Sequence, residues 1–315
     1  MYAYLVRRLL QFAVVLLLGS IAVWAFVFAL PGDPATVLLG PDASDAELAA
    51  TRARLGLDES VAGQYLTWLG HALSGDLGTS FHSDQSVVDV LRERVPATAQ
   101  LAVMGMVLTL AIAVPAGVVV ALRPRSVLGR AFQAYLTGGL AIPAFWLGLL
   151  LIIVLAVQSR LLPATSDYVP FWEDAGQALR HTILPAIALA VPSSAVLARF
   201  VATSLGEIMT RDYIRTARAK GLPERSVIRG HALRNAALPT VTVVGMQLGG
   251  FVGGAVAIEA VFNYPGLGRL LYTAIGERDY VVVQGGVLFV VAAFLCLNLI
   301  VDVLYAYLDP RIRLL

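Results

Sequence analysis

The sequence predicts an all-α polytopic membrane protein with six transmembrane helices. Apolar residues make up 58% of the 315 residues and charged residues only 14%, whereas about a quarter of the residues in soluble domains are charged. The mean hydropathy is +0.77. Six runs without Asp, Glu, Lys or Arg are 18 to 29 residues long, and a helix of roughly 20 apolar residues spans the hydrocarbon core of a bilayer. Helices are expected because a lipid-exposed backbone must satisfy its own hydrogen bonds, and the ten-residue alternation of a membrane barrel is missing from the sequence.

The six runs cover residues 9–32, 95–122, 131–159, 181–198, 235–258 and 280–301. The first follows Arg7 and Arg8, as the apolar core of a secretory signal peptide would. It is longer than a typical signal core, however, and its end makes a poor cleavage site, so we expect an uncleaved first span.

The segment after the first run, residues 31–94, is too long for a simple turn. Ser44 and Glu47 have the spacing of a capping box, which predicts a helix that ends near Gly56. Apolar residues at helical spacing between Val61 and Ala72 predict a second short helix. Two amphipathic helices on the outer face would either cap the bundle or form a docking platform for an extracytoplasmic partner.

Basic residues predict the orientation. Fourteen of them flank the runs on the side that carries both termini, and eight lie in the longer, acid-rich segments of the opposite side. Basic residues concentrate in short cytoplasmic segments, so both termini are predicted to be cytoplasmic. We divide the chain into residues 1–95, the first span with the outer segment, and residues 96–315, a five-helix core.

The loop between the fourth and fifth runs, residues 207–239, carries seven of the 23 basic residues but only three acids. A proline followed by an acid, Pro223 and Glu224, is typical of a helix start. Apolar residues from Val227 to Leu233 then form a stripe among arginines, which predicts a short amphipathic helix. This helix would lie on the membrane surface or insert into a groove of a cytosolic protein.

A small number of polar or small residues inside the runs are candidates for a function. Three glycines recur every four residues in the fifth run, and such ridges let helices approach closely, within the subunit or along a pathway between subunits. Ionisable groups in a membrane are functional candidates, although an interfacial position or a structural hydrogen bond explains the carboxylates near the ends of the runs better. The candidates for the pathway or for helix packing are Gly245, Gly249, Gly253, Glu259, Asn298 and Asp302.

The sequence lacks the motifs of an enzyme or of a self-contained pump. A phosphate-binding loop needs Gly-Lys-Ser/Thr, but the only lysine, Lys220, lies between Ala219 and Gly221. The four histidines are far apart in the sequence, and the only cysteine is Cys296. We therefore expect no catalytic residue, no metal site and no cofactor in this chain.

The motifs DYIRTARAKGL, HALRNAALP, EAVFNYPGLGRLL and ERDYVVVQG, with a terminal LDPRIR, resemble the dipeptide/oligopeptide/nickel permeases of ATP-binding cassette importers. The segments LPGDPA and SGDLGTSF are similar to the branch with the longer outer segment, so the resemblance covers nearly the whole chain. The 207–239 loop resembles the EAA loop of these permeases, with Arg-Thr-Ala at 215–217 in place of Glu-Ala-Ala and Arg234 in place of a proline. By this resemblance, the residues that couple to the ATPase are Ala217, Gly221, Leu222, Pro223, Glu224, Arg225, Val227, Ile228 and Arg229.

The resemblance implies the fold of a type I importer permease in the bacterial plasma membrane. Its partners would be a homologous second permease, two ATPase subunits that bind ATP and Mg²⁺, and an extracytoplasmic binding protein that delivers short peptides. Nickel chelates, glutathione or another small ligand are alternative cargoes. A secondary transporter is the alternative of a different class, but the internal repeats and broken helices typical of that class are not evident in the runs.

Overall fold

The computed structural model describes residues 2–28, 33–40, 43–54 and 56–308, and helices make up most of this part of the chain. In this part of the chain, Thr79 and Ser86 form an isolated antiparallel bridge. The helices are α1 (Tyr2–Phe28), α2 (Pro34–Leu39), α3 (Asp45–Arg54), α4 (Val61–Leu73), α5 (Val87–Leu122), α6 (Val127–Ala141), α7 (Ala144–Leu151), η1 (Ile152–Gln158), α8 (Ala175–Met209), α9 (Asp212–Ala219), α10 (Glu224–Ser226), η2 (Val227–Ala232), α11 (Leu233–Phe262), α12 (Leu267–Glu277) and α13 (Tyr280–Leu308).

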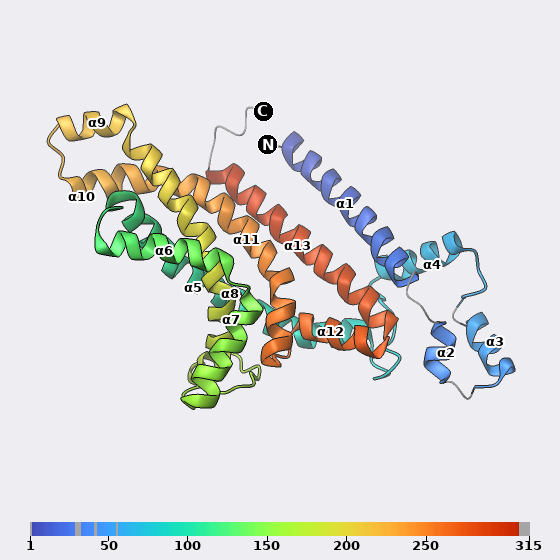
Figure 1. The fold of residues 1–315 in the computed structure, drawn as a ribbon. Coiled ribbons are helices and arrows are strands. Elements are labelled where there is room, and N and C mark those ends of the chain that lie inside the picture. Colours follow the sequence, from blue (N-terminus) through green and yellow to red (C-terminus); the bar gives the residue numbers. More distant parts are fainter. Residues whose placement is uncertain (1, 29–32, 41–42, 55, 309–315) are drawn as a thin grey trace.

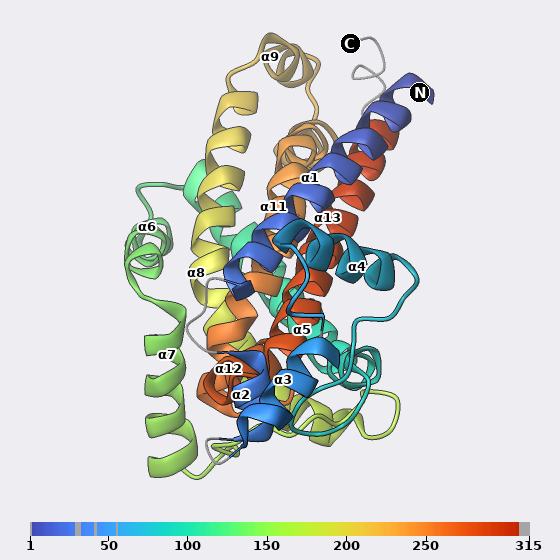
Figure 2. The ribbon, with the colours of Figure 1, turned by 90° about the vertical axis from the view of Figure 1, so that its right-hand side faces the viewer.

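The bundle is built around the two longest helices, α5 and α8, which pack along each other. α11 packs on α8 and α13, and α1 lies along α13 at the edge of the bundle (Figures 1 and 2). The start of α1 and the end of α13 lie at the end of the bundle that carries α9, whereas α2, α3 and α12 lie toward the other end (Figure 1). The bundle therefore has two chemically different ends joined by apolar helices.

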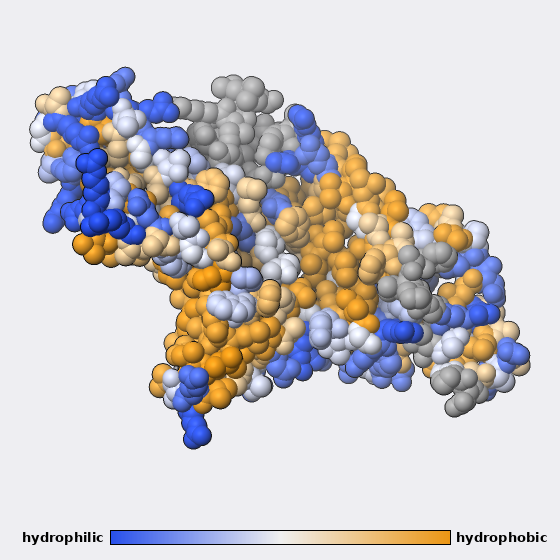
Figure 3. Space-filling model, viewed as in Figure 1, coloured by the Kyte–Doolittle hydropathy of each residue, from blue (hydrophilic) through white to orange (hydrophobic). Residues whose placement is uncertain are grey.

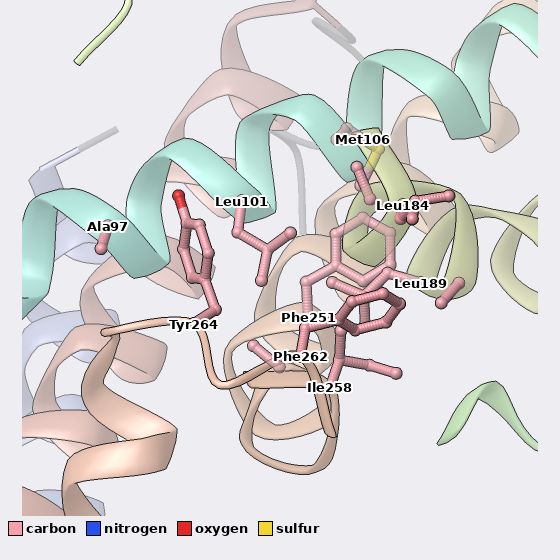
Figure 4. Close-up of a cluster of buried hydrophobic side chains, with 12 residues drawn as sticks. Ala97, Leu101, Met106, Leu184, Leu189, Phe251, Ile258, Phe262 and Tyr264 are labelled. Carbon is pink, nitrogen blue, oxygen red and sulfur yellow. The ribbon is translucent and has the colours of Figure 1, made fainter. Parts of the chain in front are cut away.

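The main core lies where α5, α8 and α11 meet. Leu101, Leu184, Phe251 and Phe262 are buried there, together with Tyr264 from the turn after α11 (Figure 4). Burying a large apolar side chain contributes roughly 1.5–3 kcal/mol. This cluster therefore fixes the three helices relative to one another.

All six predicted runs are helical, but not all are straight. α1, α5, α8 and α13 are each long and apolar enough to cross a membrane alone. The third run, predicted as one span, is bent: it forms α6 and a second helix, α7 with η1, which meet at 105°. The fifth run, α11, bends by 49° between Phe251 and Gly253. Two of the six runs are therefore bent, a feature that was not evident in the sequence.

Local sequence explains both bends. Ile142 precedes Pro143 and is extended, with φ −90° and ψ 118°, as the steric clash with a following proline favours. In α11 the bend falls among Gly249, Gly250, Gly253 and Gly254, where the helix lacks side chains that would stiffen it. Glycine and proline thus mark the two places where a span changes direction.

The outer segment contains the two predicted helices, α3 and α4, and one that was missed, α2. The capping box is present: the Glu47 carboxylate accepts from Ser44 N at 2.9 Å, and Ser44 Oγ accepts from Glu47 N at 3.4 Å. The hydrogen bond that Ser44 Oγ donates lowers the pKa of Glu47. α2 begins at Pro34 behind Asp33, whose carboxylate accepts from Ala35 N at 3.1 Å. α1 packs on α4, where Trp24 and Tyr65 meet edge to face.

Candidate coupling site and polar groups of the spans

The basic loop projects from the end of the bundle as a helical hairpin (Figure 1). α8 ends at Met209, α9 follows at Asp212, and a turn over residues 220–223 leads into α10 and η2. The predicted amphipathic helix is thus present as α10 with η2, whereas α9 was not predicted. α9 has an apolar face beneath its basic residues, and its Ile214 is fully buried.

A small core of its own holds the hairpin on the bundle. Ile214 and Ala217 of α9 pack with Val227 and Ala232 of η2 and with Leu205 of α8. Because two of the predicted coupling residues, Ala217 and Val227, are buried in this core, their side chains support the hairpin from beneath. The side chains of Leu222, Pro223, Glu224, Arg225 and Arg229 are exposed, and Ile228 is half-buried.

The turn between α9 and α10 has a defined geometry. Gly221 has φ +75°, a left-handed conformation that glycine adopts without steric cost. A Cβ at this position would meet nothing within 4 Å, so the space outside the turn is open. Arg218 spans the turn and donates two hydrogen bonds to the Glu224 carboxylate, from Nε at 3.1 Å and from Nη2 at 2.7 Å. These bonds lower the pKa of Glu224 and raise that of Arg218.

The glycines of α11 face in two directions. A Cβ on Gly245 would lie 2.1 Å from Val301 Cγ1, and one on Gly249 would lie 2.5 Å from Phe294 Cε2. These two glycines therefore pack directly against α13. Gly253 is exposed, and a Cβ there would meet nothing within 4 Å. The predicted ridge is thus partly a packing face and partly an open face of this chain.

Glu259 is fully buried and joins three helices. Its carboxylate accepts from Thr98 Oγ1 at 2.6 Å and from the backbone N–H groups of Gly268 and Arg269 at 2.7 and 3.1 Å. Thr98 Oγ1 in turn accepts from Leu267 N at 2.8 Å. The first N–H groups of α12 are thus satisfied by a threonine of α5 and a glutamate of α11. Glu259 thus makes structural hydrogen bonds, one of the interpretations given for it.

The remaining polar candidates, Asn298 and Asp302, belong to α13. Asn298 is half-buried in α13, and the side chain of Asp302, one turn later, lies outside the described residues. Residues that the sequence did not single out make cross-helix bonds instead: Gln247 Nε2 of α11 donates to Ser193 O of α8 at 3.1 Å. Gln100 Nε2 of α5 donates to Thr182 Oγ1 of α8 at 3.2 Å. These uncharged pairs join the same three helices as the main core.

Thr98 and α12 were not predicted from the sequence. Thr98 lies three residues into an apolar run, where a threonine is unremarkable. The Pro-Gly-Leu-Gly segment at 265–268 was a usable signal, because an acid six to seven residues before a glycine-rich helix start can reach back to its N–H groups. A Cβ on Gly266 would lie 2.3 Å from the Glu259 carboxyl carbon, so this position must be glycine for the carboxylate to approach.

Two family models match the chain. The model described as "Binding-protein-dependent transport system inner membrane component" matches residues 113–314, and its N-terminal companion, "Binding-prot-dependent transport system membrane comp, N-term", matches residues 1–102. The chain is 38% identical over 313 residues to the glutathione transport system permease protein GsiC of Escherichia coli (strain K12), covering 99% of both chains. The same figures hold for GsiC of Shigella flexneri serotype 5b (strain 8401).

Two solved structures have a similar fold. The MetNI methionine ABC transporter in inward-facing conformations matches with a TM-score of 0.57 and 21% identity, over 70% of this chain and 96% of the other. An amino acid ABC transporter with histidines matches with a TM-score of 0.50 and 17% identity, over 71% and 94%. At these identities the likeness concerns the fold alone.

Proposed function

Because this chain belongs to the family of inner membrane components of binding-protein-dependent transport systems, and is therefore a permease subunit of an ATP-binding cassette importer, we propose the assembly and the cargo with which it works. A homologous second permease completes the pathway, and two ATPase subunits bind ATP and Mg²⁺. An extracytoplasmic binding protein delivers the cargo on the side opposite the basic hairpin. The observation that carries this proposal is the likeness to whole permeases over 313 residues.

The hairpin of α9, α10 and η2 is the proposed contact with the ATPase. It projects beyond the bundle, its basic and apolar side chains are exposed, and a core beneath it holds its shape. The Arg218–Glu224 bonds and the left-handed Gly221 fix the turn before α10. A preorganised, exposed helix start fits a groove on a partner without an ordering cost.

The proposed cargo is a short peptide, with glutathione as the first candidate. GsiC belongs to a glutathione transport system, and glutathione is a tripeptide. The described spans agree with weak selection: Gln247, Gln100 and Thr182 are uncharged, and three groups of its own chain engage the buried carboxylate of Glu259. An importer gains little from tight binding inside the membrane, because the cargo must leave again.

Uptake by cells that lack this permease tests the cargo. We expect loss of uptake of radiolabelled glutathione, and of di- and tripeptides if the range is broad, while uptake of free amino acids is unchanged. Restoring the permease should restore uptake only when the partner ATPases are present. Unchanged peptide and glutathione uptake, with loss of nickel-dependent enzyme activity, would identify a nickel chelate as the cargo.

A further inference from the structure

A hollow of about 340 Å³ lies where η1 ends and α8 begins, at the end of the bundle opposite the hairpin of α9 and α10 (Figure 1). Its lining is strongly basic: the residues are Arg160, Leu162, Pro163, Gln177, Arg180 and His181. None of these residues is among the predicted coupling residues. Arg160 and Arg180 are twenty positions apart in the sequence, and the return of the chain from η1 to α8 brings them to one place.

The two arginines of the hollow are not held by acids of this chain through ion pairs. In the described part of the chain, neither Arg160 nor Arg180 takes part in an ion pair or a side-chain hydrogen bond. Asp174, the residue before α8, is its N-cap and accepts from Gln177 N at 3.0 Å. Nδ1 of His181 accepts from Asp167 N at 3.2 Å, which leaves Nε2 as the donor of the neutral ring. The hollow thus offers donors to an anion.

The conformation of the chain contributes to the hollow. η1 stops at Gln158, and Arg160 has φ +50°, a left-handed conformation that is uncommon outside glycine. Leu161 N then donates to Leu155 O at 2.9 Å, so the chain folds back against η1. This reversal sets the arginine beside the first turns of α8.

Exposed apolar side chains surround the basic group. Val157 and Leu161 are 60% and 64% exposed beside Arg160, and Leu179 is 44% exposed beside Arg180. The surface over α7 is hydrophobic and ends in a hydrophilic tip (Figure 3). Basic residues at the end of an apolar membrane helix lie at the depth of the lipid headgroups, where the charge can reach a phosphate while the apolar neighbours contact acyl chains.

We propose that this hollow binds the phosphate headgroup of an anionic phospholipid in the leaflet opposite the basic hairpin. Guanidinium groups match phosphate oxygens with paired hydrogen bonds. Inorganic phosphate offers the same chemistry to the arginines, but it leaves Val157, Leu161 and Leu179 without a partner. A lipid satisfies both parts of the surface.

Native mass spectrometry of the full chain in mild detergent tests the proposal, with phosphatidylglycerol, phosphatidylcholine and inorganic phosphate as separate probes. We expect preferential retention of phosphatidylglycerol over phosphatidylcholine. In the double variant Arg160→Gln/Arg180→Gln this preference should fall by about five-fold for each arginine, since a basic residue near an anionic surface contributes roughly that factor. The matched control is Arg92→Gln/Arg94→Gln, which removes two charges from the start of α5 on the same side and should keep the preference.

Four results would overturn the proposal. The wild type could retain both lipids equally, the double variant could keep the full preference, or the control could lose as much as the double variant. The fourth is removal of the bound phosphatidylglycerol by inorganic phosphate at millimolar concentration, which would show a phosphate site without lipid specificity. A loss of the folded charge-state distribution in the double variant is checked with Arg160→Lys/Arg180→Lys, which keeps the charges and should keep the preference in part.

Discussion

Glu259 is a buried carboxylate with a structural role. It lies near one end of α11, where a membrane carboxylate could hold a proton or a cation, but Thr98 Oγ1 and the N–H groups of Gly268 and Arg269 occupy its oxygens. A buried charge is tolerated when hydrogen bonds replace its hydration. Its position therefore fixes the angle at which α12 leaves α11 and meets α5.

Replacing Thr98 with valine should destabilise this junction. Thr98→Val keeps the shape of the side chain but removes the donor to Glu259 and the acceptor for Leu267 N. We expect a loss of about 2–4 kcal/mol in the free energy of unfolding, because a buried carboxylate and a buried N–H each lose a partner. Denaturant unfolding in detergent, followed by helical circular dichroism, measures it. Thr98→Ser retains the hydroxyl and should lose much less; equal values for the two variants would contradict the network.

Gly221 is expected to matter for the partner more than for folding. Gly221→Trp puts a large side chain into open space, so the protein should still insert, at a cost of about 1–2 kcal/mol for the left-handed backbone. ATP-driven uptake should nevertheless fall strongly, because the indole blocks the seating of the hairpin in the ATPase. Gly221→Asn is the control, since asparagine tolerates this conformation. Normal uptake by Gly221→Trp would show that the turn does not contact the ATPase.

At the scale of elements, prolines show why the sequence could predict helices but not their shape. Pro96 and Pro115 lie inside α5, Pro185 and Pro192 inside α8, and all four are accommodated without a break. Pro143 ends a helix. The extended Ile142 before Pro143 marks the bend between α6 and α7, but the same residue type lies inside two runs that stay helical. A proline in an apolar run therefore does not by itself tell which run bends.

The two faces of α11 predict different effects for similar substitutions. Gly249→Ala places a methyl group against Phe294, at 2.5 Å before relaxation, and should lower the free energy of unfolding by about 1–3 kcal/mol, as overpacking does. Gly253→Ala meets open space within this chain and should leave the unfolding of the isolated subunit within about 0.5 kcal/mol. Denaturant unfolding compares the two.

Uptake assays extend that comparison to the assembled transporter. If Gly253→Ala impairs uptake while leaving the subunit stable, the open face of α11 meets the second permease or the cargo. Equal destabilisation by the two alanines would contradict the assignment of the two faces.

At the scale of the whole molecule, the orientation predicted from basic residues can be measured directly. Ser83 is exposed in the outer segment and Ser226 is exposed in α10. In a Cys296→Ser background, a cysteine at Ser83 should react with an impermeant thiol reagent added to intact cells, whereas one at Ser226 should react only after lysis. The control is the Cys296→Ser chain itself, which should not react. Labelling of Ser226 in sealed cells would reverse the topology.

The class of the fold followed from the sequence because its signals are long and redundant. Six apolar runs and an asymmetric distribution of arginines predict a helical membrane protein with little ambiguity. Short elements were harder: α2, α9 and α12 are 6, 8 and 11 residues long. The burial of Ala217 and Val227 beneath the hairpin was also not predictable, because it depends on how α9 folds back over η2.

The hairpin and the fifth span are joined through continuous helical backbone. α10, η2 and α11 follow one another from Glu224 onward without a loop residue between them, and α11 bends by 49° between Pro239–Phe251 and Gly253–Phe262. At about 1.5 Å per residue the part from Pro239 to Phe251 is roughly 20 Å long, so a tilt of about 10° would move its far end by about 3 Å. In the proposed assembly, a small movement of the hairpin on its ATPase would thus be passed along the backbone into the membrane. The glycines at the bend would let the two parts of α11 turn relative to each other, so their flexibility would decide how much of that movement reaches the outer part of the span.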